Sequence, residues 1–189
     1  MSWTRSVPPE RASEPVRSLY EKIRARSGGR VSELWQALAP DPAALEGIFA
    51  LVRDLLDHPA PLTPAQAEAI VVVVSATNGC AYCVAHHGPK LAAALGDEGL
   101  AHAVALDYRE ANLPARDRVL LDHAVALTCE PGERTEEDVE RLRDYGFDDA
   151  AILRATAIAA LFNLINRMAS PLGVALEPGV EPWEFGAQK

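Results

Sequence analysis

The chain has 189 residues, of which 49% are hydrophobic and 24% charged, proportions typical of a globular protein that can bury a sizeable core. Its formal net charge of −9 argues against nucleic acid and against a membrane as partners, because nucleic acid and anionic membrane surfaces bind basic proteins. Every uninterrupted apolar run is far shorter than the ~18 residues that cross a bilayer, and the N-terminal segment lacks the apolar core of a signal peptide. We therefore expect a cytoplasmic location.

The first third of the chain predicts three helices. Pro15 opens a helix over 16–23, which the pair Gly28-Gly29 ends. A short helix over 31–38 follows, and Asp41-Pro42 caps a third. Apolar residues recur in this third helix with a 3.6-residue period (Leu45, Ile48, Phe49, Val52, Leu55 and Leu56). We assign 1–30 to an N-terminal extension with one helix and 31–176 to a single helical domain.

The next segment carries a clear helix start. Thr63 is a suitable N-cap, Pro64 suits the first helical position and Gln66 completes a capping box. Four consecutive valines over 71–74 favour a strand on propensity alone. The capping signals and the length of the segment nevertheless predict a helix over 64–77. Because it is apolar on every side, this helix should be buried on most of its faces.

A Cys-x-x-Cys motif follows directly. Asn78-Gly79 is a turn signal, so Cys80 should lie in the opening turn of a new helix that continues to Leu95. On that helix Cys80, Cys83 and His87 would share one face, with the two thiols close enough to meet. A helix N-terminus also stabilises an anion, which lowers the pKa of a thiol placed there.

Four further helices are predicted after Gly96, over 97–106, 114–127, 135–146 and 150–169. The tail over 177–189 has no helical pattern and could wrap a neighbouring subunit. No segment other than the valine run resembles a strand. The predicted fold is therefore all-α, a bundle of about eight helices with the Cys-x-x-Cys helix at its centre.

A partner for His87 follows from helix geometry. If the helix over 64–77 and the Cys-x-x-Cys helix fold back on each other, the midpoint of the hairpin lies near Asn78. With a rise of about 1.5 Å per residue, Glu68 and His87 then lie at nearly the same height. A carboxylate opposite an imidazole orients the ring and raises its basicity. Glu68, His87, Cys80 and Cys83 therefore form the predicted site.

The residues alone leave two questions open. The cysteines could be core filler, since free cysteine is often buried, or they could bind zinc together with His87. A structural zinc site usually has four ligands and the chain has no second Cys-x-x-Cys, so we expect neither a metal nor an organic cofactor. The attacking thiol is also open: the helix dipole favours Cys80, whereas His87 follows Cys83 by one helical turn.

The spacing of the motif resembles that of a known family. Glu68, eleven residues, Cys80, two residues, Cys83, three residues and His87 resemble the signature of the alkylhydroperoxidase D-like proteins within the carboxymuconolactone decarboxylase superfamily. The run Cys80-Ala-Tyr-Cys-Val-Ala-His-His87 is similar to its peroxidase-related branch in particular. The resemblance implies a helical bundle and a thiol-dependent peroxidase. It also implies a homo-oligomer, whether dimer, trimer or hexamer.

The resemblance further implies roles for the residues. Cys83 would attack a hydroperoxide, Cys80 would resolve the product into a disulfide, and Glu68 with His87 would relay protons. A dithiol or a protein reductant would then restore the thiols. Tyr82 occupies the position where the resembled peroxidases carry a relay histidine, and its phenol could donate a hydrogen bond to the peroxide. The alternatives are lactone decarboxylation, as in the namesake of the superfamily, and a non-catalytic oligomer that senses redox state.

Overall fold

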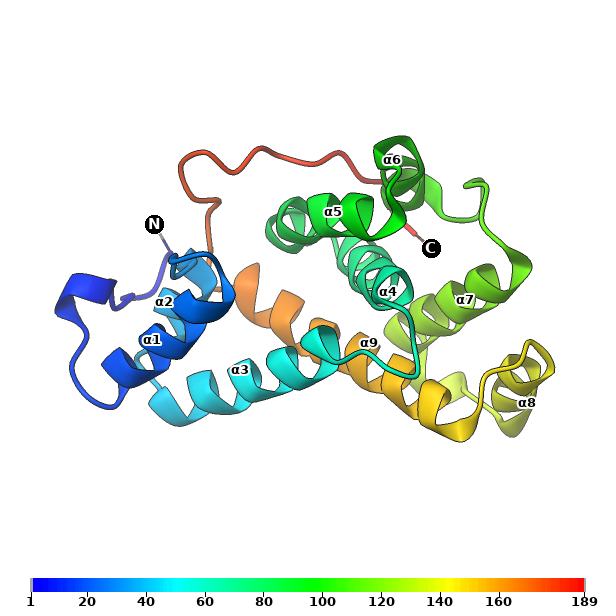
Figure 1. The fold of residues 1–189 in the computed structure, drawn as a ribbon, viewed down its shortest axis with the longest axis horizontal. Coiled ribbons are helices and arrows are strands. Elements are labelled where there is room, and N and C mark those ends of the chain that lie inside the picture. The colour runs from blue at the N-terminus through cyan, green and yellow to red at the C-terminus, as the bar shows by residue number, and fades with distance from the viewer. Residues whose placement is uncertain (1, 189) are drawn as a thin grey trace.

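A computed structural model describes residues 2–188, and within them all regular secondary structure is helical, with no β-strand. The all-α class is thus confirmed, and the described residues form nine α-helices where about eight were expected (Figure 1). They are α1 (Val16–Arg26), α2 (Glu33–Leu38), α3 (Pro42–Asp57), α4 (Pro64–Thr77), α5 (Ala81–Leu95), α6 (Glu98–Asp107), α7 (Ala115–Cys129), α8 (Glu136–Asp144) and α9 (Asp149–Ala169).

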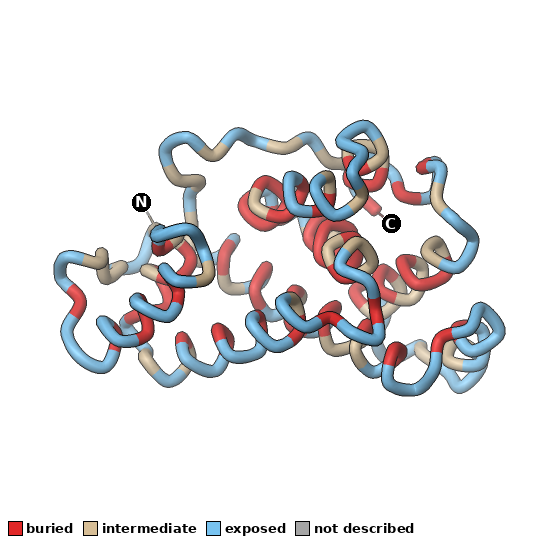
Figure 2. Tube along the Cα trace, in the orientation of Figure 1, coloured by how far each residue is buried: buried red, intermediate tan, exposed pale blue. Residues whose placement is uncertain are grey.

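Helix α4 is the centre of the bundle. Its residues from Ala69 to Ala76 are all buried, and α5, α6, α7 and α9 pack around it (Figure 2). The predicted capping box is present, with Thr63 and Gln66 bonding reciprocally, and the Gln66 side chain also donates to Asp117 of α7 at 2.7 Å. The valine run is helical because burial on every side stabilises apolar residues in any secondary structure, which outweighs their weak preference for strands.

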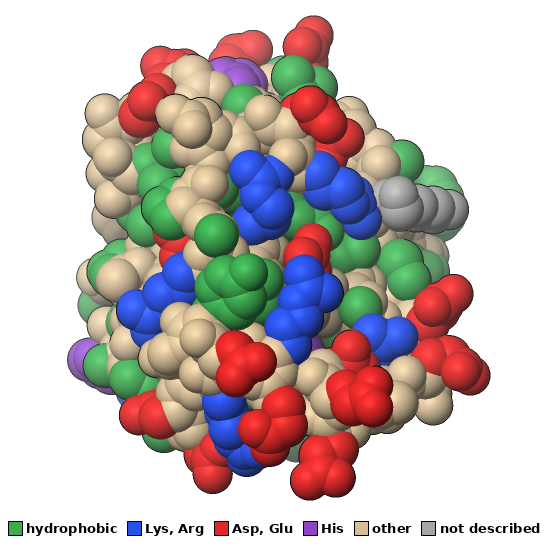
Figure 3. Space-filling model, turned by 90° about the vertical axis from the view of Figure 1, so that its right-hand side faces the viewer, with side chains coloured by type: hydrophobic (Ala, Val, Ile, Leu, Met, Phe, Trp, Pro, Cys, Tyr) green, Lys and Arg blue, Asp and Glu red, His purple; other side chains and the backbone are tan. Residues whose placement is uncertain are grey.

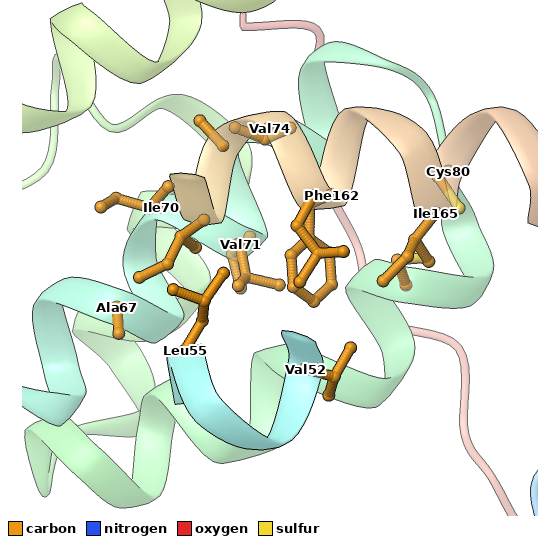
Figure 4. Packing of buried hydrophobic residues seen from close by; sticks show 14 of the residues in the cluster. Val52, Leu55, Ala67, Ile70, Val71, Val74, Cys80, Phe162 and Ile165 are labelled. Carbon is orange, nitrogen blue, oxygen red and sulfur yellow. The ribbon is translucent and has the colours of Figure 1, made fainter. Parts of the chain in front are cut away.

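Helix α9 packs against α4, α7 and α3. Phe162 and Ile165 of α9 meet Val71 of α4 and Val52 of α3 in one apolar cluster (Figure 4). By length and composition α9 is the one helix in the described chain that could cross a bilayer. Half of its most apolar window is buried against the rest of the protein, as expected for the core helix of a bundle.

The N-terminal helix joins the same core. Leu19, Tyr20 and Ile23 of α1 are buried in the cluster that includes α3 and α4, and the Tyr20 hydroxyl donates to the Val7 carbonyl at 2.6 Å. Helix α1, which lies within the region assigned to an N-terminal extension, therefore packs against the main bundle.

The C-terminal tail packs on its own chain, and its expected contact with a neighbouring subunit stays a prediction. It crosses from the end of α9 over α5 to α6 (Figure 1). Gly186 donates its N–H to the Ala105 carbonyl at 3.0 Å, and the side chain of Gln188 is buried, donating to the same carbonyl at 2.8 Å. These polar anchors fix an extended segment that has no helical hydrogen bonds of its own.

The surface at the α8 end of the molecule carries both signs of charge. On this face Lys and Arg side chains gather around hydrophobic side chains, with Asp and Glu spread toward the rim (Figure 3).

Candidate active site

The α4–α5 hairpin brings the predicted acid and imidazole together. Gly79 turns the chain with φ +67°, a left-handed conformation that glycine adopts without a steric cost, and Cys80 is the N-cap of α5. Glu68 of α4 and His87 of α5 then meet, with Glu68 Oε2 2.7 Å from His87 Nδ1. Both side chains are nearly buried, 13% and 11% exposed. The sequence predicted that Glu68 and His87 lie level with each other on the two helices, and in the structure their side chains are in direct contact.

This pair is arranged so that His87 is a neutral base. Burial, together with the charge of Lys90, lowers the pKa of His87 to about 4. Burial opposes ionisation of Glu68, but the contacts with His87, Lys90 and Arg26 hold its pKa below the ordinary value. The ionised carboxylate accepts the Nδ1 proton, and within residues 2–188 no protein group bonds to His87 Nε2. Nε2 is thus left with a free lone pair that can accept a proton.

The two cysteines are both buried and interact with each other. Interaction with Cys83 lowers the pKa of Cys80 to about 6, despite the burial that opposes ionisation. The same interaction, together with burial, raises the pKa of Cys83. In the reduced pair the negative charge is therefore favoured on Cys80, the residue at the start of α5, and disfavoured on Cys83.

Polar side chains that the sequence reasoning did not select affect the pKa values of the two thiols. Asn166 of α9, which is 2% exposed, lowers the pKa of both cysteines, Ser75 lowers that of Cys83 and Ser170 that of Cys80. A signal for them exists in the sequence: Asn163, Asn166 and Ser170 interrupt the apolar pattern of α9 at spacings of three and four, so they form one polar stripe on a buried helix.

The tail contributes a second carboxylate on the other flank of α5. Glu177 accepts a hydrogen bond from the Tyr82 hydroxyl at 2.7 Å and lies 2.8 Å from His86 Nε2. The Tyr82 oxygen also accepts the Leu34 N–H at 3.2 Å. The phenol is therefore occupied in holding the tail against α2 and α5, which contrasts with the expectation that it would donate to a peroxide. Burial raises the pKa of Tyr82 well above its ordinary value, so it stays protonated.

Further along the tail, Trp183 covers the turn of α5 that follows His87. Its ring stacks on His102 with centroids 3.9 Å apart and planes 4° from parallel. It also contacts the backbone of Gly88 so closely that a Cβ there would lie 2.6 Å from the ring. Because Gly88 has no side chain, the tail can pack closely against α5.

The remaining histidines and the third cysteine lie apart from this cluster. His123 bonds to Thr156 at 3.0 Å, and Cys129 is exposed at the end of α7. Across residues 2–188 no three or more His, Cys, Asp or Glu side chains gather in a way that could hold a metal ion.

Comparison with known proteins identifies the family of the chain. The carboxymuconolactone decarboxylase family matches residues 42–104, the stretch that contains Glu68, both cysteines and His87. The chain is similar to a peroxidase-related protein with an alkylhydroperoxidase AhpD core from Ralstonia eutropha JMP134, with 31% identity over 96% of this chain and 97% of that one and a TM-score of 0.85. A peroxidase-related protein from Silicibacter sp. TM1040 is also 31% identical, over 93% and 94% of the two chains, with a TM-score of 0.81.

A more distant likeness concerns the fold alone. The debrominase Bmp8 in complex with 2,3,4-tribromopyrrole is 15% identical over 92% of this chain and 91% of that one, with a TM-score of 0.76. No curated protein matches the chain significantly.

The fold and the site define a class: an all-helical protein in which a Cys-x-x-Cys pair is buried at the start of a helix, with a Glu–His pair on the same hairpin. The chain belongs to the alkylhydroperoxidase D-like proteins of the carboxymuconolactone decarboxylase superfamily, in the peroxidase-related branch.

Proposed function

We propose that this protein is a thiol-dependent peroxidase that reduces hydroperoxides through the Cys80–Cys83 pair. The observation that carries the proposal is the 2.7 Å contact between Glu68 and His87 on the hairpin that holds two interacting, buried thiols. A shared negative charge on the sulfurs supplies the nucleophile, and the free Nε2 of His87 supplies the base. Membership of the peroxidase-related branch supports the same reaction class.

In the proposed reaction Cys83 is the attacking sulfur and Cys80 the resolving one. The proton that Cys83 shares with Cys80 moves to Cys80 or to His87, and the Cys83 thiolate attacks the terminal peroxide oxygen. The O–O bond breaks, Cys83 becomes a sulfenic acid, and the leaving alkoxide takes a proton to form the alcohol. Cys80 then attacks the Cys83 sulfur, and the hydroxyl leaves as water with a proton from solvent, because the charged pair held a single thiol proton. The net change is a thiol, a thiolate, a proton and a hydroperoxide to a disulfide, an alcohol and water.

A dithiol or a protein reductant then reduces the disulfide and closes the cycle. Assigning the attack to Cys83 follows the family resemblance and fits its place one turn before His87, whereas the lowered pKa favours Cys80. Single variants separate the two assignments. Cys80→Ser should still consume one equivalent of hydroperoxide and leave a sulfenic acid on Cys83, which a dimedone adduct locates by mass spectrometry. Cys83→Ser should not react. The reverse pattern would exchange the two roles.

Two other functions predict different results in the same experiments. A lactone decarboxylase needs no thiols, so hydroperoxide turnover should be absent and the Cys80→Ser/Cys83→Ser double variant should still convert γ-carboxymuconolactone. A redox sensor should form the disulfide once and show negligible turnover with excess dithiol. Hydroperoxide consumption that survives the double variant would refute the thiol mechanism altogether.

Assembly into a homo-oligomer stays a prediction. Leu153 and Leu164 of α9 are exposed apolar side chains, 70% and 45% accessible, and lie at a spacing that keeps them on one helix face. Measurement of the native mass by light scattering would test it, and a monomer at micromolar concentration would contradict it.

A further inference from the structure

One side of helix α9 carries an apolar stripe that the described part of the chain leaves open to solvent. The helix packs against α4, α7 and α3. Its outer side presents Leu153, Ala157, Ala160 and Leu164, whose spacings of four, three and four place them on one face. Leu153 is 70% exposed and Leu164 45%. Because only alanines separate the two leucines along this face, the stripe is a continuous apolar surface of the kind that binds a partner.

The stripe reads the same in both directions along the helix. Leu153 and Leu164 have their midpoint between residues 158 and 159, and Ala157 and Ala160 share that midpoint. If two copies of α9 pack antiparallel about a two-fold axis at the midpoint, each Leu153 lies level with the partner's Leu164. The alanines meet near the axis, where small side chains let two helices approach closely. A two-fold interface requires this symmetry, because any contact of residue i with residue j must be returned by j with i.

The charges at the two ends of the stripe favour the antiparallel direction. Asp148 and Asp149 lie at the N-terminus of α9, and 82% of the Asp149 side chain is exposed although Arg143 bonds to it at 2.8 Å. Arg167 is exposed at the other end, and among residues 2–188 its side chain donates only within its own helix. About the same axis Arg167 lies level with the partner's Ala150, next to Asp149. A parallel pair would instead bring like charges and like helix dipoles together.

We propose that this face of α9 binds a second copy of the chain, antiparallel across a two-fold axis between residues 158 and 159. The occupant is another copy because the face complements itself, both in its apolar pattern and in its charges. The proposal goes beyond the peroxidase reaction. The buried side of α9 carries Phe162, which packs on His87 with ring centroids 4.9 Å apart, so the proposed interface and the candidate active site share one helix.

The native mass of the full chain tests the face. By multi-angle light scattering at micromolar concentration, the wild-type mass should be an even multiple of the mass of one chain. Leu153→Glu should halve it, because the interface would otherwise bury a carboxylate among apolar side chains. Leu164→Glu is the second variant, with the same expected result. Leu106→Glu is the matched control: Leu106 is 47% exposed on α6, outside the stripe, so the mass should stay at the wild-type value.

Two single-cysteine proteins test the direction. Leu153→Cys and Leu164→Cys are each made in a Cys80→Ser/Cys83→Ser/Cys129→Ser chain, mixed while reduced and then oxidised. The mixture should form a disulfide-linked dimer, because the two positions lie level across the axis. Either protein alone should not, since its two thiols are offset by eleven residues, about 16 Å along the helices. A disulfide joins Cα atoms no more than about 7 Å apart.

Circular dichroism identifies any variant that fails to fold, and the folded variants decide. A monomeric wild type would overturn the proposal, and so would a mass that the folded glutamate variants of the stripe leave unchanged. Covalent dimers from either single-cysteine protein alone, or none from the mixture, would overturn the antiparallel arrangement. None of these measurements uses a hydroperoxide. A dimer without turnover would therefore refute the proposed function and leave the interface standing, and a monomer with turnover would do the reverse.

Discussion

Replacing Glu68 by glutamine tests the link between the acid and the imidazole. Glu68 Oε2 accepts the Nδ1 proton of His87 at 2.7 Å in a nearly buried site, so solvent weakens the interaction little. Glutamine preserves the size of the side chain and an oxygen that can accept the same proton. What it removes is the negative charge that fixes the tautomer and raises the basicity of Nε2.

The size of the effect follows from the strength of that hydrogen bond. A hydrogen bond to a charged group contributes about 1.5–3 kcal/mol and a neutral one about 0.5–1.5 kcal/mol. The variant therefore loses about 1–1.5 kcal/mol from the state in which His87 holds a proton, which is a roughly tenfold slower oxidation of the thiols. Glu68→Ala, which leaves the Nδ1 proton without an acceptor, should be slowed by about a hundredfold, within the range for loss of acid–base assistance.

The assay is a single turnover. Fully reduced protein is mixed with one equivalent of tert-butyl hydroperoxide at neutral pH, and the remaining thiols are titrated over time. Glu98→Gln is the matched control, because Glu98 also faces a histidine, His102, but at 3.9 Å and with 77% of its side chain exposed; it should react at the wild-type rate. A Glu68→Gln protein that melts like the wild type and oxidises as fast would show that the carboxylate has no part in the reaction.

Two predictions concern stability. Burial lowers the pKa of His87 from 6.5 to about 4, so between these pH values the unfolded chain binds a proton that the native protein does not. The free energy of unfolding should therefore fall by on the order of 3 kcal/mol as the pH drops from 6.5 toward 4. The lowered pKa of Glu68 also makes the protein less stable as the pH falls. The reasoning would be contradicted if the urea midpoints of wild type and His87→Asn changed with pH by the same amount across this range. Gly88→Ala should destabilise by about 1–3 kcal/mol, because its Cβ would meet the Trp183 ring. Gly47→Ala in α3 is the control: its Cβ has open space, so the substitution should stabilise the protein by about 0.5–1 kcal/mol. Thermal melts in which Gly88→Ala and Gly47→Ala behave alike would show that the tail does not pack tightly against α5.

Much of the site was accessible from the sequence because it lies on one hairpin. The spacing of Cys80, Cys83 and His87 is a local property of a helix, and the height of Glu68 depends only on the rise per residue and the position of the turn. Residues that affect the thiols from elsewhere were not found this way. Asn166 lies on α9, far along the chain, and its effect on the pKa values of the thiols depends on how α9 packs against α4.

The tail illustrates the same limit. Nothing in the pattern of residues 177–189 indicates where an extended segment packs, since it has neither helical periodicity nor a partner strand. Only the fold shows that Glu177 meets Tyr82 and His86, and that Trp183 covers Gly88. The occupation of the Tyr82 hydroxyl by Glu177 could not be anticipated from the motif.

The sequence by itself determined the helices, the start of α4, the turn at Gly79 and the four residues of the hairpin, because capping, periodicity and helical rise act over a few residues. The lowered pKa of Cys80 comes first from Cys83 within the same motif, whereas tertiary packing decided how deeply both thiols are buried. The neutral state of His87 depends on burial between α4, α5 and Phe162 of α9. The contact with Phe162 joins residues far apart in the chain, so helix spacing and capping signals cannot predict it.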